Sequence, residues 1–167
     1  SVLYYTSYEV SPTEIHLYSI GLDGKNKKQL SEEPGSYSAS FSHTFDYYIM
    51  SHSGANTPPV YELYNRKGKL IRVLEDNAEL KAKAMEYGFS RVEFMKVPTA
   101  SGQELNGYMI KPRDFDPGKE YPLFIYVYGG PESQNVVDRW NRSAAWFQML
   151  VQEGYIVACV DNRGTNG

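Results

Sequence analysis

The chain has 167 residues, of which 41% are hydrophobic and 22% charged, so it can bury a hydrophobic core. Its 17 basic and 20 acidic side chains give a formal net charge of −3, which gives no reason to expect nucleic acid or an anionic membrane surface as a partner. No apolar run approaches the ~18 to 20 residues of a spanning helix, so the sequence predicts no membrane segment.

The first part of the chain contains an internal repeat. Tyr4 aligns with Tyr48 and Gly24 with Gly68, each pair 44 positions apart. Each unit is expected to form short strands separated by turns, at residues 3–7, 16–20, 28–30, 47–51, 60–65 and 70–74. A period of about 40 to 45 residues with several strands per unit is typical of β-propeller blades. A small independent antiparallel sheet is the alternative interpretation.

A second region begins near Asn77, whose side chain is expected to cap a helix over residues 78–87. Gly88 stands where a glycine commonly ends a helix in a left-handed conformation. Residues 91–97 and 104–110 follow, and the turn signal between them predicts an antiparallel hairpin.

The last part of the chain predicts a strand, a helix and a second strand. Residues 123–128 are apolar or aromatic without alternation, which is typical of a strand buried on both faces of a parallel sheet, and residues 157–160 repeat this signal. Between them Trp140, Phe147 and Val151 share one helical face, and a glycine follows them. Such a unit predicts parallel strands with a binding crevice at their carboxyl ends.

The loop after the first of these strands carries the strongest local signal for chemistry. It reads Tyr128-Gly129-Gly130-Pro131, and in an α/β-hydrolase the loop at this position supplies hydrogen-bond donors to the oxyanion. Glycines let the backbone approach a reacting carbonyl closely, and the phenol of Tyr128 can donate to a tetrahedral intermediate. A plain turn is the alternative.

Six segments, in order along nearly the whole chain, carry a resemblance to a known family. They are Leu3-Tyr4-Tyr5, Tyr37-Ser38-Ala39-Ser40-Phe41-Ser42, Arg72-Val73-Leu74-Glu75-Asp76-Asn77, Tyr121-Pro122-Leu123, Val127-Tyr128-Gly129-Gly130-Pro131 with Ser133-Gln134, and Val160-Asp161-Asn162-Arg163-Gly164. In these segments the chain resembles the prolyl oligopeptidase superfamily of serine peptidases, and most closely the dipeptidyl peptidase IV family.

The resemblance implies a mixed α and β fold. Residues 1–76 are then the C-terminal, antiparallel blades of a β-propeller, and residues 77–167 are the N-terminal portion of an α/β-hydrolase catalytic domain. It also implies a serine exopeptidase that releases N-terminal dipeptides with Pro or Ala in the penultimate position, through an acyl-enzyme, with peptides as substrates and no metal or other cofactor. Tyr128 matches the family's oxyanion donor, and Gly129 and Gly130 are candidate substrate-binding residues beside it.

The rest of the catalytic apparatus has no match in this chain. The nucleophile of such enzymes lies in a Gly-x-Ser-x-Gly elbow, followed by the acid and the histidine, and the sequence contains no such pentapeptide. We therefore expect a fragment that stops before the nucleophile, is inactive by itself, and associates or dimerises through cut sheet edges. Two alternatives stay open for the parent: an acylaminoacyl peptidase or oligopeptidase of the same superfamily, and a non-catalytic binding protein.

The histidines and one acidic pair are expected to have no catalytic role. His16, His43 and His52 all precede the hydrolase part, which is the wrong chain order for a triad histidine in this fold. The pair Glu32-Glu33 resembles the acidic residues with which the family holds a substrate amine, yet it stands outside a matching motif. We interpret it as solvated loop charge.

Three residues near the second strand of the unit are expected to be structural. Asp161 and Arg163 flank a glycine loop and are expected to form a charge-assisted pair. Cys159 is the only cysteine and is expected to be a small buried hydrophobe. One cysteine cannot form an internal disulfide, so the cellular compartment stays open, whether periplasmic, secreted or membrane-anchored.

Overall fold

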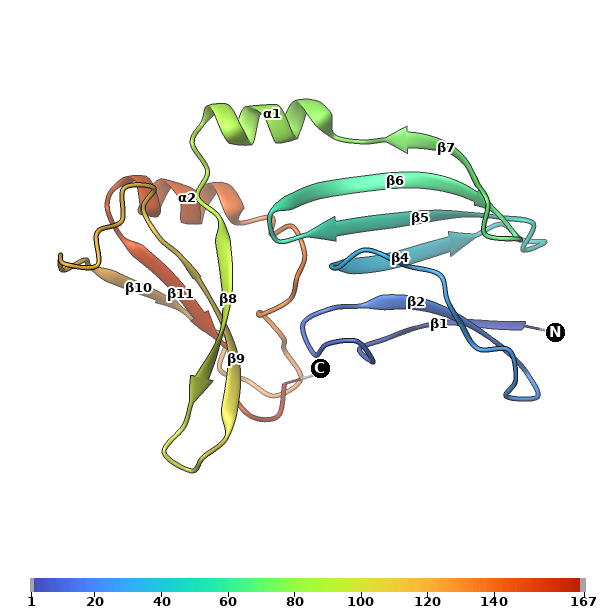
Figure 1. The fold of residues 1–167 in the computed structure, drawn as a ribbon, viewed down its shortest axis with the longest axis horizontal. Coiled ribbons are helices and arrows are strands. Elements are labelled where there is room, and N and C mark those ends of the chain that lie inside the picture. Colours follow the sequence, from blue (N-terminus) through green and yellow to red (C-terminus); the bar gives the residue numbers. More distant parts are fainter. Residues whose placement is uncertain (1, 166–167) are drawn as a thin grey trace. The chain divides into compact units, whose positions relative to one another are not determined.

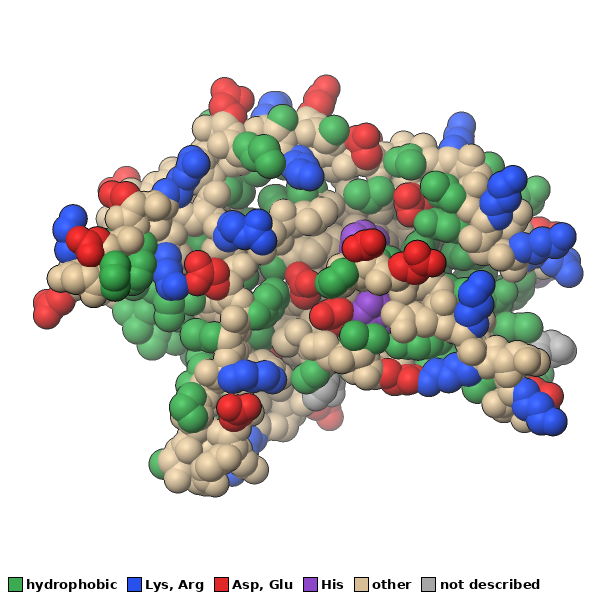
Figure 2. Space-filling model, viewed as in Figure 1, with side chains coloured by type: hydrophobic (Ala, Val, Ile, Leu, Met, Phe, Trp, Pro, Cys, Tyr) green, Lys and Arg blue, Asp and Glu red, His purple; other side chains and the backbone are tan. Residues whose placement is uncertain are grey.

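A computed structural model describes residues 2–165 and consists mostly of antiparallel β-sheets with few helices (Figure 1). The chain divides into two compact units. The first extends to Lys81 and includes Val137–Trp140, and the second contains Ala82–Val136 and the chain from Asn141 onward. In the part that the structure describes, no helix is long and apolar enough to cross a membrane. Acidic and basic side chains are interspersed on the face shown in Figure 2.

The first unit holds two antiparallel sheets. The strands of the smaller sheet, in spatial order, are β1 (Val2–Ser7), β2 (His16–Gly21) and β3 (Lys28–Gln29). Those of the larger sheet are β4 (Ser36–Phe41), β5 (Tyr47–Gly54), β6 (Thr57–Asn65) and β7 (Leu70–Glu75). Each strand of the larger sheet pairs with the next in the chain (Figure 1), which makes a four-stranded meander.

The sequence repeat is also a structural repeat. In the turn after β2 the amide of Gly21 donates to the carbonyl of Lys25 at 2.8 Å, and 44 positions later the amide of Asn65 donates to the carbonyl of Lys69 at 3.0 Å. Gly24 and Gly68 adopt φ of 76° and 78°, a region that glycine enters without steric cost. The turns that join β2 to β3 and β6 to β7 are therefore equivalent.

Strand β4 was not predicted as a strand from its residues. Its sequence, Ser-Tyr-Ser-Ala-Ser-Phe, is poor in β-branched side chains and carries little β propensity. Its six residues pair with β5 in one uninterrupted register, and Tyr37 packs in the core of the unit. Pairing with β5 and burial of that ring therefore stabilise the strand. The buried core of this unit consists of Leu17, Tyr37, Tyr48 and Met50.

The second unit is built around one mixed sheet. Its strands, in spatial order, are β10 (Leu123–Tyr126), β11 (Ile156–Val160), β9 (Glu104–Ile110) and β8 (Val92–Pro98). The predicted hairpin of β8 and β9 is antiparallel, and β10 and β11 are parallel, also as predicted. Helix α2 (Ala144–Gln152) packs against β11 and β9 (Figure 1). Its residues Phe147 and Val151 are buried.

The helix α1 (Ala78–Glu86) begins differently from the prediction. The carboxylate of Asp76, not the side chain of Asn77, accepts from the amide of Ala78, at 2.9 Å. Asn77 has φ of 51°, and its side-chain amide instead donates to the carbonyl of Pro59 at 2.6 Å. The predicted end of the helix is correct, because Gly88 follows it with φ of 70°.

Two further predictions about the second unit are wrong. The strand β10 was expected to be buried on both faces, but Leu123 is 54% and Ile125 57% exposed because β10 is the edge strand of its sheet. Trp140 was expected on the helix that became α2. It precedes that helix and belongs to the first unit, where its amide donates to Ser53 Oγ at 3.4 Å.

The core of the second unit lies between the sheet and α2. Its buried members are Tyr108, Ile110, Val136, Phe147, Val151, Val157 and Cys159. The buried amide of Gln148 on α2 pairs with both backbone groups of Ser90: it accepts from the amide at 2.6 Å and donates to the carbonyl at 2.8 Å. This pair attaches the start of the unit to its helix.

Candidate functional site

Tyr128 lies two residues beyond the end of β10, in the loop at the carboxyl end of that strand. Its side chain is 64% exposed, and within the described residues its phenol takes part in no hydrogen bond. An exposed phenol without a partner is available to donate to a ligand. The parallel strands β10 and β11 bring this loop and the loop after Val160 to the same edge of the sheet.

The two glycines after Tyr128 are required for different reasons. Gly129 has φ of 76°, and a Cβ at this position would meet no atom within 4 Å, so only its backbone conformation favours glycine. Gly130 lies against the aromatic ring of Tyr128. A Cβ on Gly130 would lie 2.6 Å from Tyr128 Cε1, closer than any real contact. The ring therefore occupies the space that a side chain at position 130 would fill.

The far end of this loop is attached to Asp161, which follows β11. The Asp161 side chain is buried, with 5% exposure, and accepts hydrogen bonds from two consecutive backbone amides. The amide of Asn135 donates to Oδ1 at 2.9 Å and to Oδ2 at 3.1 Å, and the amide of Val136 donates to Oδ2 at 2.8 Å. Val136 is itself completely buried in the core.

The expected pair of Asp161 and Arg163 is absent, because the two side chains bind different partners. The guanidinium of Arg163 donates to Gln103 Oε1 at 3.1 Å, while Asp161 binds the backbone of the opposite loop. A second link between the loops joins the amide of Glu132 to the carbonyl of Gly164 at 3.2 Å. Asp161 is structural, as predicted, but through a different set of contacts.

The buried end of β11 also changes the acidity of two side chains. Burial, and then the charge of Asp161, raise the pKa of the Cys159 thiol to about 11, so the thiol is neutral at physiological pH. Burial likewise raises the pKa of Tyr108, which faces Cys159 across the sheet. Neither group is available as a base or a nucleophile near neutral pH.

His16 lies in a buried chain of hydrogen bonds in the first unit. Its Nδ1 is 2.8 Å from Ser31 Oγ, and its Nε2 is 2.9 Å from Glu14 Oε2. This arrangement contains a serine, a histidine and an acid, but Ser31 is only 1% exposed and its oxygen accepts from the amide of Leu17 at 3.1 Å. A substrate cannot reach this hydroxyl, so the group is structural and joins β2 to the segments at Glu14 and Ser31.

The remaining histidines and the acidic pair have no catalytic arrangement either. His52 stacks on Tyr37 with ring centroids 4.4 Å apart, and its Nε2 is 3.1 Å from the carbonyl of Pro34. His43 is exposed in a turn, and the residues Glu32-Glu33 are exposed in the segment before β4. In the part of the chain that the structure describes, no group of three or more His, Cys, Asp or Glu side chains could hold a metal ion.

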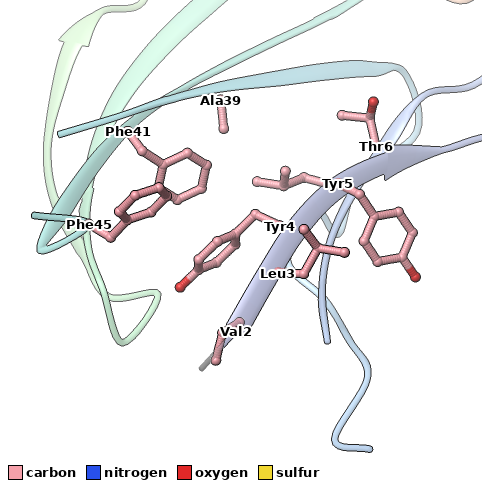
Figure 3. Close-up of a pocket in the computed structure, with 9 residues that line it drawn as sticks. Val2, Leu3, Tyr4, Tyr5, Thr6, Ala39, Phe41 and Phe45 are labelled. Atoms are coloured by element: carbon pink, nitrogen blue, oxygen red, sulfur yellow. The ribbon is translucent and has the colours of Figure 1, made fainter. Parts of the chain in front are cut away.

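The first unit contains an open hollow of about 430 Å³ beside β1 (Figure 3). The rings of Tyr4, Phe41 and Phe45 point toward one another in it, with centroids of Tyr4 and Phe41 4.4 Å apart. Its other lining residues are aliphatic or hydroxylic apart from Tyr5, so the hollow lacks an acid or a base. The hollow lies beside strands of the first unit and contributes no acid or base.

Known proteins are similar to this chain over nearly its whole length. The family model described as the N-terminal region of dipeptidyl peptidase IV matches residues 1–59. A probable dipeptidyl-aminopeptidase B of Aspergillus niger is 37% identical over 98% of this chain and 18% of its own length. The dipeptidyl peptidase 4 of Trichophyton rubrum is 35% identical over 98% of this chain and 22% of its own length.

A solved structure matches nearly the full length of this chain. The crystal structure of Porphyromonas gingivalis dipeptidyl peptidase 4 is 40% identical to this chain and superposes with a TM-score of 0.92. The match covers 99% of this chain and 23% of that protein. The chain thus spans about a fifth of the length of the curated relatives it matches, which are themselves covered to 18% and 22%.

Proposed function

Because this chain belongs to the dipeptidyl peptidase IV family, we propose that the full-length protein is a serine peptidase that releases dipeptides from the N-terminus of peptides. Substrates with Pro or Ala in the penultimate position would be cleaved through an acyl-enzyme. The names of the relatives support the reaction class. The observation in this chain that carries the proposal is the exposed phenol of Tyr128 at the carboxyl end of a parallel strand.

We propose the same division of the chain that the sequence predicts: propeller blades in residues 1–76 and the start of a catalytic domain in residues 77–167. The four-stranded meander of β4 to β7 has the arrangement of one blade and supports the first half. The parallel pair β10 and β11, with α2 between them in the chain, supports the second half.

In the proposed reaction Tyr128 acts as a hydrogen-bond donor to the oxyanion. When the serine attacks the scissile carbonyl, negative charge develops on the carbonyl oxygen, and a donor already in place stabilises that charge without reorganisation. Tyr128 meets the requirement because its phenol is exposed and donates to no other group in the described residues. Peptides are the proposed partners.

The experiment is a kinetic comparison of the full-length protein with its Tyr128→Phe variant on chromogenic Gly-Pro and Ala-Pro dipeptides. Loss of one oxyanion donor should lower kcat by ~10²-fold or more. Matched substrates with a blocked N-terminus distinguish a dipeptidyl peptidase, which requires the free amine, from an acylaminoacyl peptidase or oligopeptidase. An unchanged kcat in the variant would refute the role of Tyr128, and a wild-type protein without turnover would refute the activity.

A further inference from the structure

A buried carboxylate holds the end of the loop that begins at Tyr128, and we propose that Asp161 is a positioning residue for the oxyanion donor. Its side chain fixes the backbone at Asn135 and Val136, so that the loop keeps the Tyr128 phenol in one place. This inference rests on the proposed function, in which Tyr128 stabilises the oxyanion. Asp161 itself touches no reacting atom.

The backbone of Asp161 is itself held in place by the sheet. Its amide donates to the carbonyl of Asn106 on the central strand β9 at 3.0 Å, so its backbone continues the sheet. The two oxygens then meet the amides of Asn135 and Val136 at 2.8 to 3.1 Å. Because Val136 is also completely buried in the core, the far end of the loop is held by packing and by charge-assisted bonds together.

A carboxylate is the side chain that this geometry requires. Two neighbouring backbone amides point at one group, and an ionised carboxylate offers only acceptors, whereas an asparagine would present its NH₂ group to one of the amides. The site is buried, so a backbone amide that loses its acceptor cannot donate to water instead. The change from Asp161 to Asn should therefore loosen the end of the loop.

The loop needs such a restraint because two consecutive glycines at its beginning restrict the backbone little. Gly129 and Gly130 follow Tyr128 directly, and glycine restricts the backbone less than any other residue. The position of the phenol thus depends on restraints further along the loop. These are the bond between Glu132 and Gly164 at 3.2 Å and the carboxylate of Asp161.

The test is steady-state kinetics of the full-length protein carrying Asp161→Asn, with Asp114→Asn as a matched control. Asp114 is exposed in the loop after β9, so the control removes one negative charge without touching the site. We expect Asp161→Asn to lower kcat by ~10- to 10²-fold, as a displacement of about 1 Å does, with little change in KM. Wild-type kcat in Asp161→Asn would overturn the proposal.

A double-mutant cycle with Tyr128→Phe separates positioning from general damage. If Asp161 acts through the phenol, its substitution should cost almost nothing once the phenol is gone, because the two effects are coupled. Equal losses in the two backgrounds would overturn the proposal. A wild-type protein that fails to cleave Gly-Pro substrates refutes the proposed function instead, and the two failures are distinguishable.

Amide hydrogen exchange in the full-length wild-type protein gives a readout that needs neither activity nor a folded variant. Asn135 and Val136 should exchange slowly because their amides are bonded to a buried carboxylate. The exposed residues Ala100 and Ser101, in the turn between β8 and β9, serve as an internal standard for fast exchange. Exchange at Asn135 as fast as in that turn would overturn the proposal.

Discussion

The contact between Gly130 and the ring of Tyr128 makes Gly130→Ala a direct probe of the proposed oxyanion donor. The new Cβ would lie 2.6 Å from Tyr128 Cε1, whereas carbon atoms in contact are about 3.5 to 4.0 Å apart. The ring must therefore move by about 1 Å or more. Because Tyr128 is 64% exposed, the ring can swing into solvent without disturbing the core, so the change alters the position of the phenol rather than the fold.

Gly130→Ala should lower kcat of the full-length protein on Gly-Pro substrates by ~10- to 10²-fold, with KM and the melting temperature nearly unchanged. Gly24→Ala is the matched control, since a Cβ there meets nothing within 4 Å, its φ of 76° is strained for alanine, and it lies in a turn of the first unit. The control should cost about 1 to 2 kcal/mol of stability and leave kcat closer to wild type. Wild-type kcat in Gly130→Ala, or an equal loss in the Tyr128→Phe background, would refute the reasoning.

Two further predictions concern stability. The pKa of Cys159 is raised from 9.0 to about 11, which favours the protonated thiol in the folded state. The resulting stabilisation of the folded state is fully present below pH 9 and is lost as the pH rises through 11. About 2 to 3 kcal/mol of unfolding free energy should disappear over that range, measured by urea denaturation, and Cys159→Ala should flatten this part of the profile; an unchanged slope in the variant would contradict the assignment. Ser31→Ala should cost ~1 to 3 kcal/mol because it removes the acceptor of the Leu17 amide and a partner of His16, whereas the exposed Ser38→Ala should cost far less. A loss of peptidase activity in Ser31→Ala at unchanged stability would show that the buried hydroxyl has a role beyond packing.

Features that depend on neighbouring residues in the chain could be predicted from the sequence. The equivalent turns at Gly24 and Gly68, the helix end at Gly88 and the hairpin of β8 and β9 all follow from glycine conformation or from alternation of side chains. The parallel pairing of β10 with β11 was also predictable, because a helical stripe separates two apolar runs. The family resemblance and the place of Tyr128 at a strand end depend on the same kind of local signal.

Tertiary structure decided which side chains are buried and what the polar groups bind. Strand β10 has an apolar sequence yet lies at a sheet edge, and β4 has a weak strand sequence yet is held by β5. The partners of Asp161 are backbone amides 25 and 26 positions away. Every residue except proline carries such an amide, so no sequence pattern marks them. The residue types and their spacing thus determined the candidate site, while the packing of β11 against the loop determined how that site is held.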